Sequence, residues 1–197
     1  MTLADFIAQY DHPGTVVLLL GKRKVIPAEL HLLEELGAQL TSTTKHLLFR
    51  SGNAGGADSL FATGVASIDP GRMEVITPYE GHRKANATLF KSTSLDHVDL
   101  ASEPDITYYA RLNNPSVNLV DRYRDGFRDK SAMKGAYLLR DTLMVIGAQG
   151  LYIPKASFAI FYDDLIKPKD GGTGHTMRVC DSLEIPFIDQ RVWMEWI

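Results

Sequence analysis

The chain has 197 residues, of which 45% are hydrophobic and 23% are charged, and its formal net charge at pH 7 is −3. This length suits one α/β domain with a substantial core, and the composition excludes disordered and fibrous proteins. The slightly acidic charge disfavours a DNA-coating protein, because nucleic-acid binding would then depend on a local basic patch. We therefore expect a single domain over residues 1–197.

The first half of the sequence alternates between strand and helix patterns. The apolar run TVVLLLG at 15–21 predicts a strand buried on both faces, and leucines at helical spacing after Pro27 predict a helix. A second strand at 46–52, a second helix at 57–68 and a third strand at 73–78 follow in the same way. This order predicts a three-layer α/β fold with a doubly wound, mostly parallel sheet of the Rossmann type.

The second half begins with a weakly patterned segment at about 80–130, which we interpret as an insertion or a lid. A largely apolar helix is predicted after it. The remaining predicted elements are a buried strand in SFAIFYDD, a glycine turn and helix in GGTGHTMRVCDSL, and a last strand in IPFIDQ.

The C-terminal RVWMEWI gives the chain a bulky apolar end with two tryptophans. One interpretation is docking against the chain's own sheet edge. Aromatic residues and methionine are also enriched at protein interfaces, and on that ground we predict a homodimer.

The cysteine content and the hydropathy of the sequence indicate the cellular compartment and whether the chain contacts a membrane. Cys180 is the only cysteine, so an intrachain disulfide is excluded and a reducing cytoplasm fits best. No apolar run approaches the roughly 20 residues that span a bilayer, and the N-terminus lacks a basic leader. The histidines have no metal-ligand spacing. We predict a cytoplasmic protein without membrane contact, structural metal or separate cofactor.

Three loops that follow predicted strands are rich in glycine or basic residues: GKRK at 21–24, SGNAGG at 51–56 and KPKDGGTGHT at 167–176. Glycine lets backbone amides approach a ligand closely, and the first amides of a helix attract anions. In a doubly wound sheet all three loops lie at the carboxyl edge, so we expect them to converge on a phosphate-bearing ligand. The alternative is a set of tight turns whose glycines serve packing alone. The candidate ligand-binding residues are Gly21, Lys22, Arg23, Ser51, Gly52, Asn53, Gly55, Gly56, Asp58, Arg140, Gly171, Gly172, Thr173, Gly174 and His175.

Three stretches, FRSGNAGGAD, LLRDTLMV and DGGTGHTMRVCDSLEIPF, together resemble the SLOG superfamily of Rossmann-like proteins, which includes DprA and the LOG phosphoribohydrolases. The resemblance covers most of the chain outside residues 80–130. It implies that the glycine loops hold the phosphate and ribose of a nucleotide-like ligand, and that Arg140, in an Arg-x-x-x-Met pattern, faces that ligand. Neither glycine stretch is a Walker loop or a G-x-G-x-x-G fingerprint, which disfavours ATPases and dehydrogenases.

The sequence departs from the LOG motif Pro-Gly-Gly-x-Gly-Thr-x-x-Glu at three positions. Asp170, His175 and Arg178 stand where the proline, the threonine and the glutamate would fall. The carboxylate that would stabilise an oxocarbenium-like state is therefore missing at that position. No catalytic residue is assigned, and Asp58, Asp163, Asp164 and Asp170 are the carboxylates that could replace it.

The sequence allows two roles each for Arg140 and His175. Arg140 lies among leucines and requires an anionic partner, either the ligand or a protein carboxylate such as Asp141. His175 is either a phosphate donor or acid–base group, or a polar residue of a helical first turn.

The leading functional hypothesis is binding of a nucleotide or nucleotide-derived ligand, for sensing or for processing. The first alternative, a LOG-like nucleoside-monophosphate phosphoribohydrolase, is disfavoured by the missing glutamate. The second, a DprA-like single-stranded DNA-binding protein, is favoured by RSGNAGGAD and opposed by the net charge, so we expect weak binding to single-stranded DNA.

Overall fold

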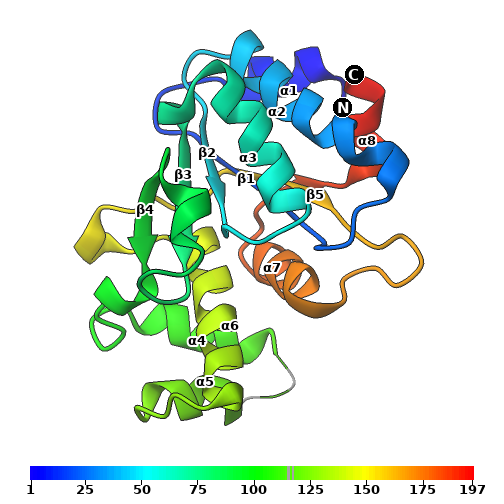
Figure 1. Cartoon of the computed structure of the whole chain (residues 1–197). Coiled ribbons are helices and arrows are strands. Elements are labelled where there is room, and N and C mark those ends of the chain that lie inside the picture. Colours follow the sequence, from blue (N-terminus) through cyan, green and yellow to red (C-terminus); the bar gives the residue numbers. More distant parts are fainter. Residues whose placement is uncertain (115, 117) are drawn as a thin grey trace.

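The computed structural model describes residues 1–114, 116 and 118–197, and these residues form one six-stranded parallel sheet (Figure 1). The strand order is β4-β3-β2-β1-β5-β6, with every neighbouring pair parallel. The strands are β1 (Val16–Gly21), β2 (Leu48–Ser51), β3 (Met73–Thr77), β4 (Lys91–Ser94), β5 (Phe158–Tyr162) and β6 (Phe187–Ile188). The predicted doubly wound α/β fold is confirmed.

Helices cover both faces of the sheet. One layer contains α1 (Leu3–Tyr10), α2 (Leu30–Thr43), α3 (Ala57–Ile68) and α8 (Gln190–Trp193). The other contains α4 (Pro104–Leu112), α5 (Asn118–Arg124), α6 (Lys130–Ile146) and α7 (Gly171–Ser182).

The central strand β1 explains why its sequence is continuously apolar. Val17 and Leu19 belong to the core beneath α2 and α3, whereas Leu18 and Leu20 belong to the core beneath α6 and α7. Since successive side chains point to opposite faces, a strand between two helical layers needs apolar residues at every position.

A buried ion pair joins two neighbouring strands. Arg50 is fully buried, and its Nε donates to Glu74 Oε1 at 2.7 Å. Its Nη1 also donates to the carbonyl oxygens of Met144, near the end of α6, and of Pro154. The Arg50 side chain therefore ties the sheet to the carboxyl end of α6, where helix carbonyls lack intrahelical partners.

The segment at about 80–130 contributes to both the sheet and a helical layer. It contains the edge strand β4 and the helices α4 and α5, which contact α6. Gly135 of α6 allows the close approach, because a Cβ there would collide with the Leu119 carbonyl. The interpretation of this segment as an insertion or a lid stays a prediction.

The C-terminal residues dock on the chain's own core. Trp193 is fully buried, and its indole Nε1 donates to Phe161 O at 2.9 Å. The Trp196 ring lies 5.3 Å from the ring of Phe6, centroid to centroid. The two tryptophans of the tail are therefore buried within the chain itself and no longer argue for a dimer. The homodimer stays a prediction. No helix within the described residues has both the length and the apolar character needed to cross a membrane.

Candidate functional site

The candidate site is a cleft at the carboxyl ends of β1 and β5. The chain leaves β1 toward α2 on one face of the sheet and leaves β5 toward α7 on the other, which creates a crevice between the two strand ends. A cavity of about 1170 Å³ occupies this position. Its walls come from the loops after β1 and β5, from α6 and from the start of α7. This volume accommodates a ligand of nucleotide size.

Asp58, in the first turn of α3, holds two of the predicted ligand loops together. Its Oδ1 accepts from Gly21 N at 3.0 Å, and its Oδ2 accepts from Gly52 N at 3.2 Å and Ala54 N at 3.3 Å. Burial raises the pKa of Asp58, while the nearby Arg140 guanidinium opposes that rise. The amides of Gly52 and Ala54 are therefore directed at an internal carboxylate.

Packing explains Gly56. Its φ is +80°, and a Cβ would collide with the backbone of Arg23 in the loop after β1. Gly21 is similar, because a Cβ there would lie 2.5 Å from Tyr162 O of the neighbouring strand. Both glycines bring the loops into contact with each other.

The glycines that begin α7 differ from these. A Cβ on Gly171, which has φ +63°, would meet no atom within 4 Å, and one on Gly172 would meet only Asp141 Oδ2, at 3.2 Å. Gly174, one turn further, is again closely packed, against the Lys169 backbone. The space beside Gly171 is therefore open to a ligand, whereas the space beside Gly172 is bounded by the Asp141 carboxylate.

Arg140 is buried in α6 and reaches the loop after β2. Its Nη1 donates to Gly52 O, and its Nε lies 2.9 Å from Asp141 Oδ1, although the angle is too poor for a hydrogen bond. Asp141 is thus its nearest anionic partner in the described chain. Burial, with a smaller contribution from the nearby Asp58, raises the pKa of Asp141 to about 6, although the Arg140 guanidinium opposes this rise.

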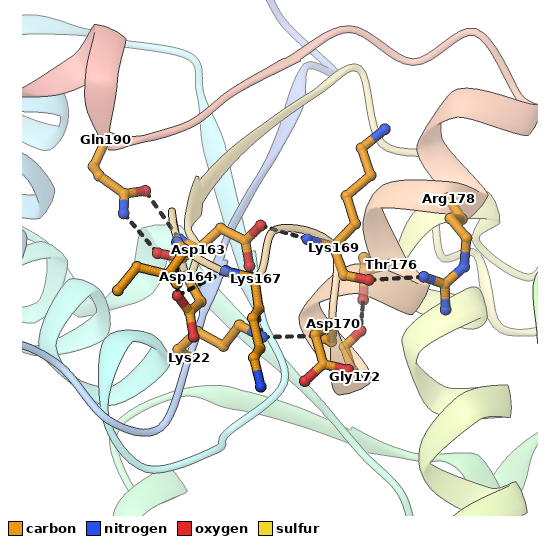
Figure 2. Close-up of polar contacts among 11 residues, drawn as sticks. Lys22, Asp163, Asp164, Lys167, Lys169, Asp170, Gly172, Thr176, Arg178 and Gln190 are labelled. Atoms are coloured by element: carbon orange, nitrogen blue, oxygen red, sulfur yellow. Dashed lines mark hydrogen bonds and ion pairs between the residues drawn. The ribbon is translucent and has the colours of Figure 1, made fainter.

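The loop after β5 fixes a third buried carboxylate, Asp163 (Figure 2). Gln190 bonds both backbone groups of Asp163, donating to its O at 2.6 Å and accepting from its N at 2.9 Å. Asp163 Oδ2 accepts from Lys169 N at 2.8 Å, and Oδ1 lies 3.7 Å from Lys22 Nζ. Lys22 Nζ donates in turn to Asp170 O at 2.8 Å, which links the loops after β1 and β5.

His175 and Arg178 use their polar atoms within the protein. The His175 ring nitrogens lie 3.1 Å from Thr142 Oγ1 and 3.3 Å from Asn113 O. Burial lowers the pKa of His175 to about 4, so the ring is neutral at pH 7. Arg178 donates to Asn113 O at 3.0 Å and to Lys169 O at 2.9 Å. These residues hold α7 in place.

The remaining predicted residues fall into two groups. Arg23 and Thr173 line the cavity. Ser51 and Asn53 are buried at the end of β2, where the Asn53 amide donates to His82 O at 3.2 Å, and Gly55 faces the Arg83 guanidinium.

Several cleft residues were not among the sequence candidates. Tyr137, Asp141, Tyr162 and Gln190 all line the cavity. The sequence could have identified Asp141, because it directly follows Arg140, which needs an anionic partner. It could not have identified Gln190, because Gln190 is distant in sequence from its partner Asp163.

Comparison with known proteins supports the fold. No protein-family model and no curated protein matches the chain. Among solved structures, it is similar to DNA processing protein A from Helicobacter pylori, whose structure concerns a single-stranded DNA binding mode. The TM-score is 0.54 at 15% identity, and the alignment covers 90% of this chain and 65% of that one. The two proteins share the fold. This chain corresponds to slightly less than two thirds of the length of its structural neighbour.

Because Asp141 is buried, we expect the stability difference between the wild type and Asp141→Asn to depend on pH. The pKa of Asp141 is raised from 3.8 to about 6, so the folded state binds more protons than the unfolded state between these values, and stability falls as the pH rises through them. Asp141→Asn should match the wild type near pH 4 and exceed its free energy of unfolding by about 3 kcal/mol at pH 7, since one pKa unit corresponds to about 1.4 kcal/mol. Urea unfolding at several pH values tests this, with the exposed Asp125→Asn as control. A pH-independent difference would contradict it.

The glycines predict contrasting effects on stability. Gly56→Ala should lower the free energy of unfolding by about 1–3 kcal/mol or more, because positive φ and the Arg23 backbone both oppose a side chain. Gly172→Ala should change it by no more than about 1 kcal/mol, because alanine favours a helix while its Cβ would lie 3.2 Å from Asp141 Oδ2. Denaturant unfolding of both variants provides the measurement. Equal stabilities would show that the first loop adapts to a side chain.

Proposed function

We propose that the chain is a SLOG-type protein that binds single-stranded DNA, with one nucleotide unit seated in the cleft between β1 and β5. The observation that carries this proposal is the open first turn of α7 beside a nucleotide-sized cavity with basic residues at its rim. The fold shared with DNA processing protein A favours DNA as the polymer.

The phosphate has its best position at the start of α7. Asp170 caps the helix without a side-chain hydrogen bond, and no described residue accepts from the amides of Gly171, Gly172 or Thr173. Such amides, together with the helix dipole, bind anions. Lys22 Nζ lies beside them, bonded to Asp170 O. The loop at 51–56 is less suitable, because Asp58 already occupies two of its amides.

The base has its best position against the apolar wall of the cavity. Leu20, Ile26 and Met144 line this wall together with the aromatic ring of Tyr137. Every nucleobase has a π-face, so an aromatic and apolar wall accepts bases with little sequence preference.

Basic side chains lie along the lining of the cleft, together with the carboxylates of Glu29, Asp164 and Asp170. Its basic residues are Lys22, Arg23, Lys24, Lys134, Arg178 and Arg191. Arg23, Lys24 and Lys134 are exposed, so their charges are available to the phosphates on either side of the bound nucleotide.

A salt titration tests single-stranded DNA binding. Fluorescence anisotropy with labelled dT12 should show binding at about 50 mM salt that weakens steeply at higher salt. Lys134→Gln and Lys24→Gln should each lower the affinity several-fold and reduce the log–log salt slope by about 0.7, the value for one phosphate contact on a single strand. Gly172→Val should weaken binding at every salt concentration, because a side chain would fill the anion position.

Lys45→Gln is the matched control, because Lys45 is exposed just before β2, at the opposite edge of the sheet. It removes the same charge and should leave binding unchanged. Absence of binding at about 50 mM salt, or equal losses in Lys45→Gln and Lys134→Gln, would refute the proposal.

A free nucleotide is the second candidate ligand, because a cavity of about 1170 Å³ has room for a complete mononucleotide. Phosphoribohydrolase chemistry is less well supported, since Arg178 stands in place of the LOG glutamate and donates to protein carbonyls. Incubation with AMP, GMP, CMP or UMP should therefore release little or no free base, as measured by chromatography. Several turnovers per minute that are lost in an Arg140 variant would instead establish an enzyme and require a replacement carboxylate.

A further inference from the structure

A second cavity, of about 840 Å³, lies beyond the end of β4 and shares no lining residue with the cleft. Its walls come from η4 (Leu95–His97), the turn at 98–101, α4, and the end of α5 with the loop that follows. Nothing in the proposed function uses this cavity.

Two buried polar atoms in its wall have no partner. Thr107 is 6% exposed, and its Oγ1 makes no hydrogen bond with the described residues. The Nε of Arg111, one turn further along α4, is also buried and unpartnered within the described chain. A buried donor without an acceptor destabilises the folded chain, so a ligand that accepts from both would be favoured.

The arginines that line the cavity have N–H groups that do not donate to other described residues. Arg111 pairs with Asp121 through Nη2, which leaves Nε free for another acceptor. Arg124 is 3.8 Å from the same carboxylate. Arg128 donates through Nη1 to the carbonyl of Tyr123 and stacks over its ring at 4.2 Å.

The carboxylates of the cavity, in contrast, are occupied by protein donors. Asp96 accepts from the Tyr123 hydroxyl at 3.0 Å and from Glu80 N at 2.9 Å. Asp99 accepts from Ala101 N at 3.0 Å and from the Ser102 hydroxyl at 2.6 Å. The cavity therefore offers more unused donors than unused acceptors, and its three arginines outnumber the two carboxylates Asp96 and Asp99, a balance that suits an anion.

We propose that this cavity binds the phosphate group of a nucleotide. Thr107 Oγ1 and Arg111 Nε have almost no accessible surface in this structure, so their side chains turn into the cavity to donate to the phosphate oxygens. Arg124 supplies further positive charge. Tyr108, which is 57% exposed in the same wall, offers its ring for stacking with the base.

Two conservative variants separate binding from structure. Thr107→Val keeps the shape and removes only the hydroxyl, which bonds nothing in the described chain, so the melting temperature should stay unchanged or rise. Arg111→Lys keeps the charge and removes the Nε donor. Both should weaken phosphate binding at least five-fold, whereas Lys45→Gln should not change it.

The measurement is a titration of the ¹⁵N-labelled full chain with inorganic phosphate and, separately, with AMP, followed by amide chemical shifts. Saturable shifts at Thr107 and Arg111 are expected, with AMP binding more tightly because of Tyr108. Gly172→Val should leave these shifts unchanged, which distinguishes this cavity from the cleft. The absence of saturable shifts up to about 10 mM of either probe, or equal affinity in Thr107→Val and the wild type, would overturn the proposal.

Discussion

The buried carboxylate of Asp58 is the interaction on which the cleft depends. It accepts hydrogen bonds from the amides of Gly21, Gly52 and Ala54, and therefore connects the end of β1, the end of β2 and the start of α3. A carboxylate that receives three amides is held firmly despite the cost of burial. Arg140 adds a fourth element, α6, because it donates to Gly52 O beside this carboxylate. This single side chain therefore fixes the side of the cleft that β1, β2 and α3 form.

This arrangement changes the meaning of the glycine-rich loop at 51–56. Small residues there suggest close approach of a phosphate, but the structure brings Asp58 and the Arg23 backbone close to the loop. An internal carboxylate satisfies the same amides that an external anion would use. The second glycine stretch, at the start of α7, resembles the first in sequence but has no such occupant among the described residues. Glycine content alone does not distinguish a loop that binds a protein side chain from one that is open to a ligand.

The sequence was sufficient for the fold and only partly sufficient for the site. The predicted strands in the first half have their expected places because strands buried on both faces leave a strong apolar signal. β4 left none, because its residues, KSTS, are polar and lie at the sheet edge, and its pairing with β3 is a tertiary effect. The sequence also contained no sign that Arg50 and Glu74 form an ion pair. They become partners only because the register of β2 and β3 places them opposite each other. Likewise, nothing near Asp163 in sequence indicated that Gln190 would bond both of its backbone groups.

The buried charges of the cleft also restrict the orientation in which the proposed nucleotide would bind there. Asp58, Asp141 and Asp163 lie within the cavity wall, against the two cations Arg140 and Lys22. A phosphate placed deep among three carboxylates would meet like charge in a poorly solvated environment, where repulsion is strong. The favourable orientation therefore places the phosphate at the first turn of α7, beside Lys22, and the base against the apolar wall. Even there, an added anion raises the pKa of Asp141 above its value of about 6, so binding of the proposed nucleotide is coupled to proton uptake near neutral pH.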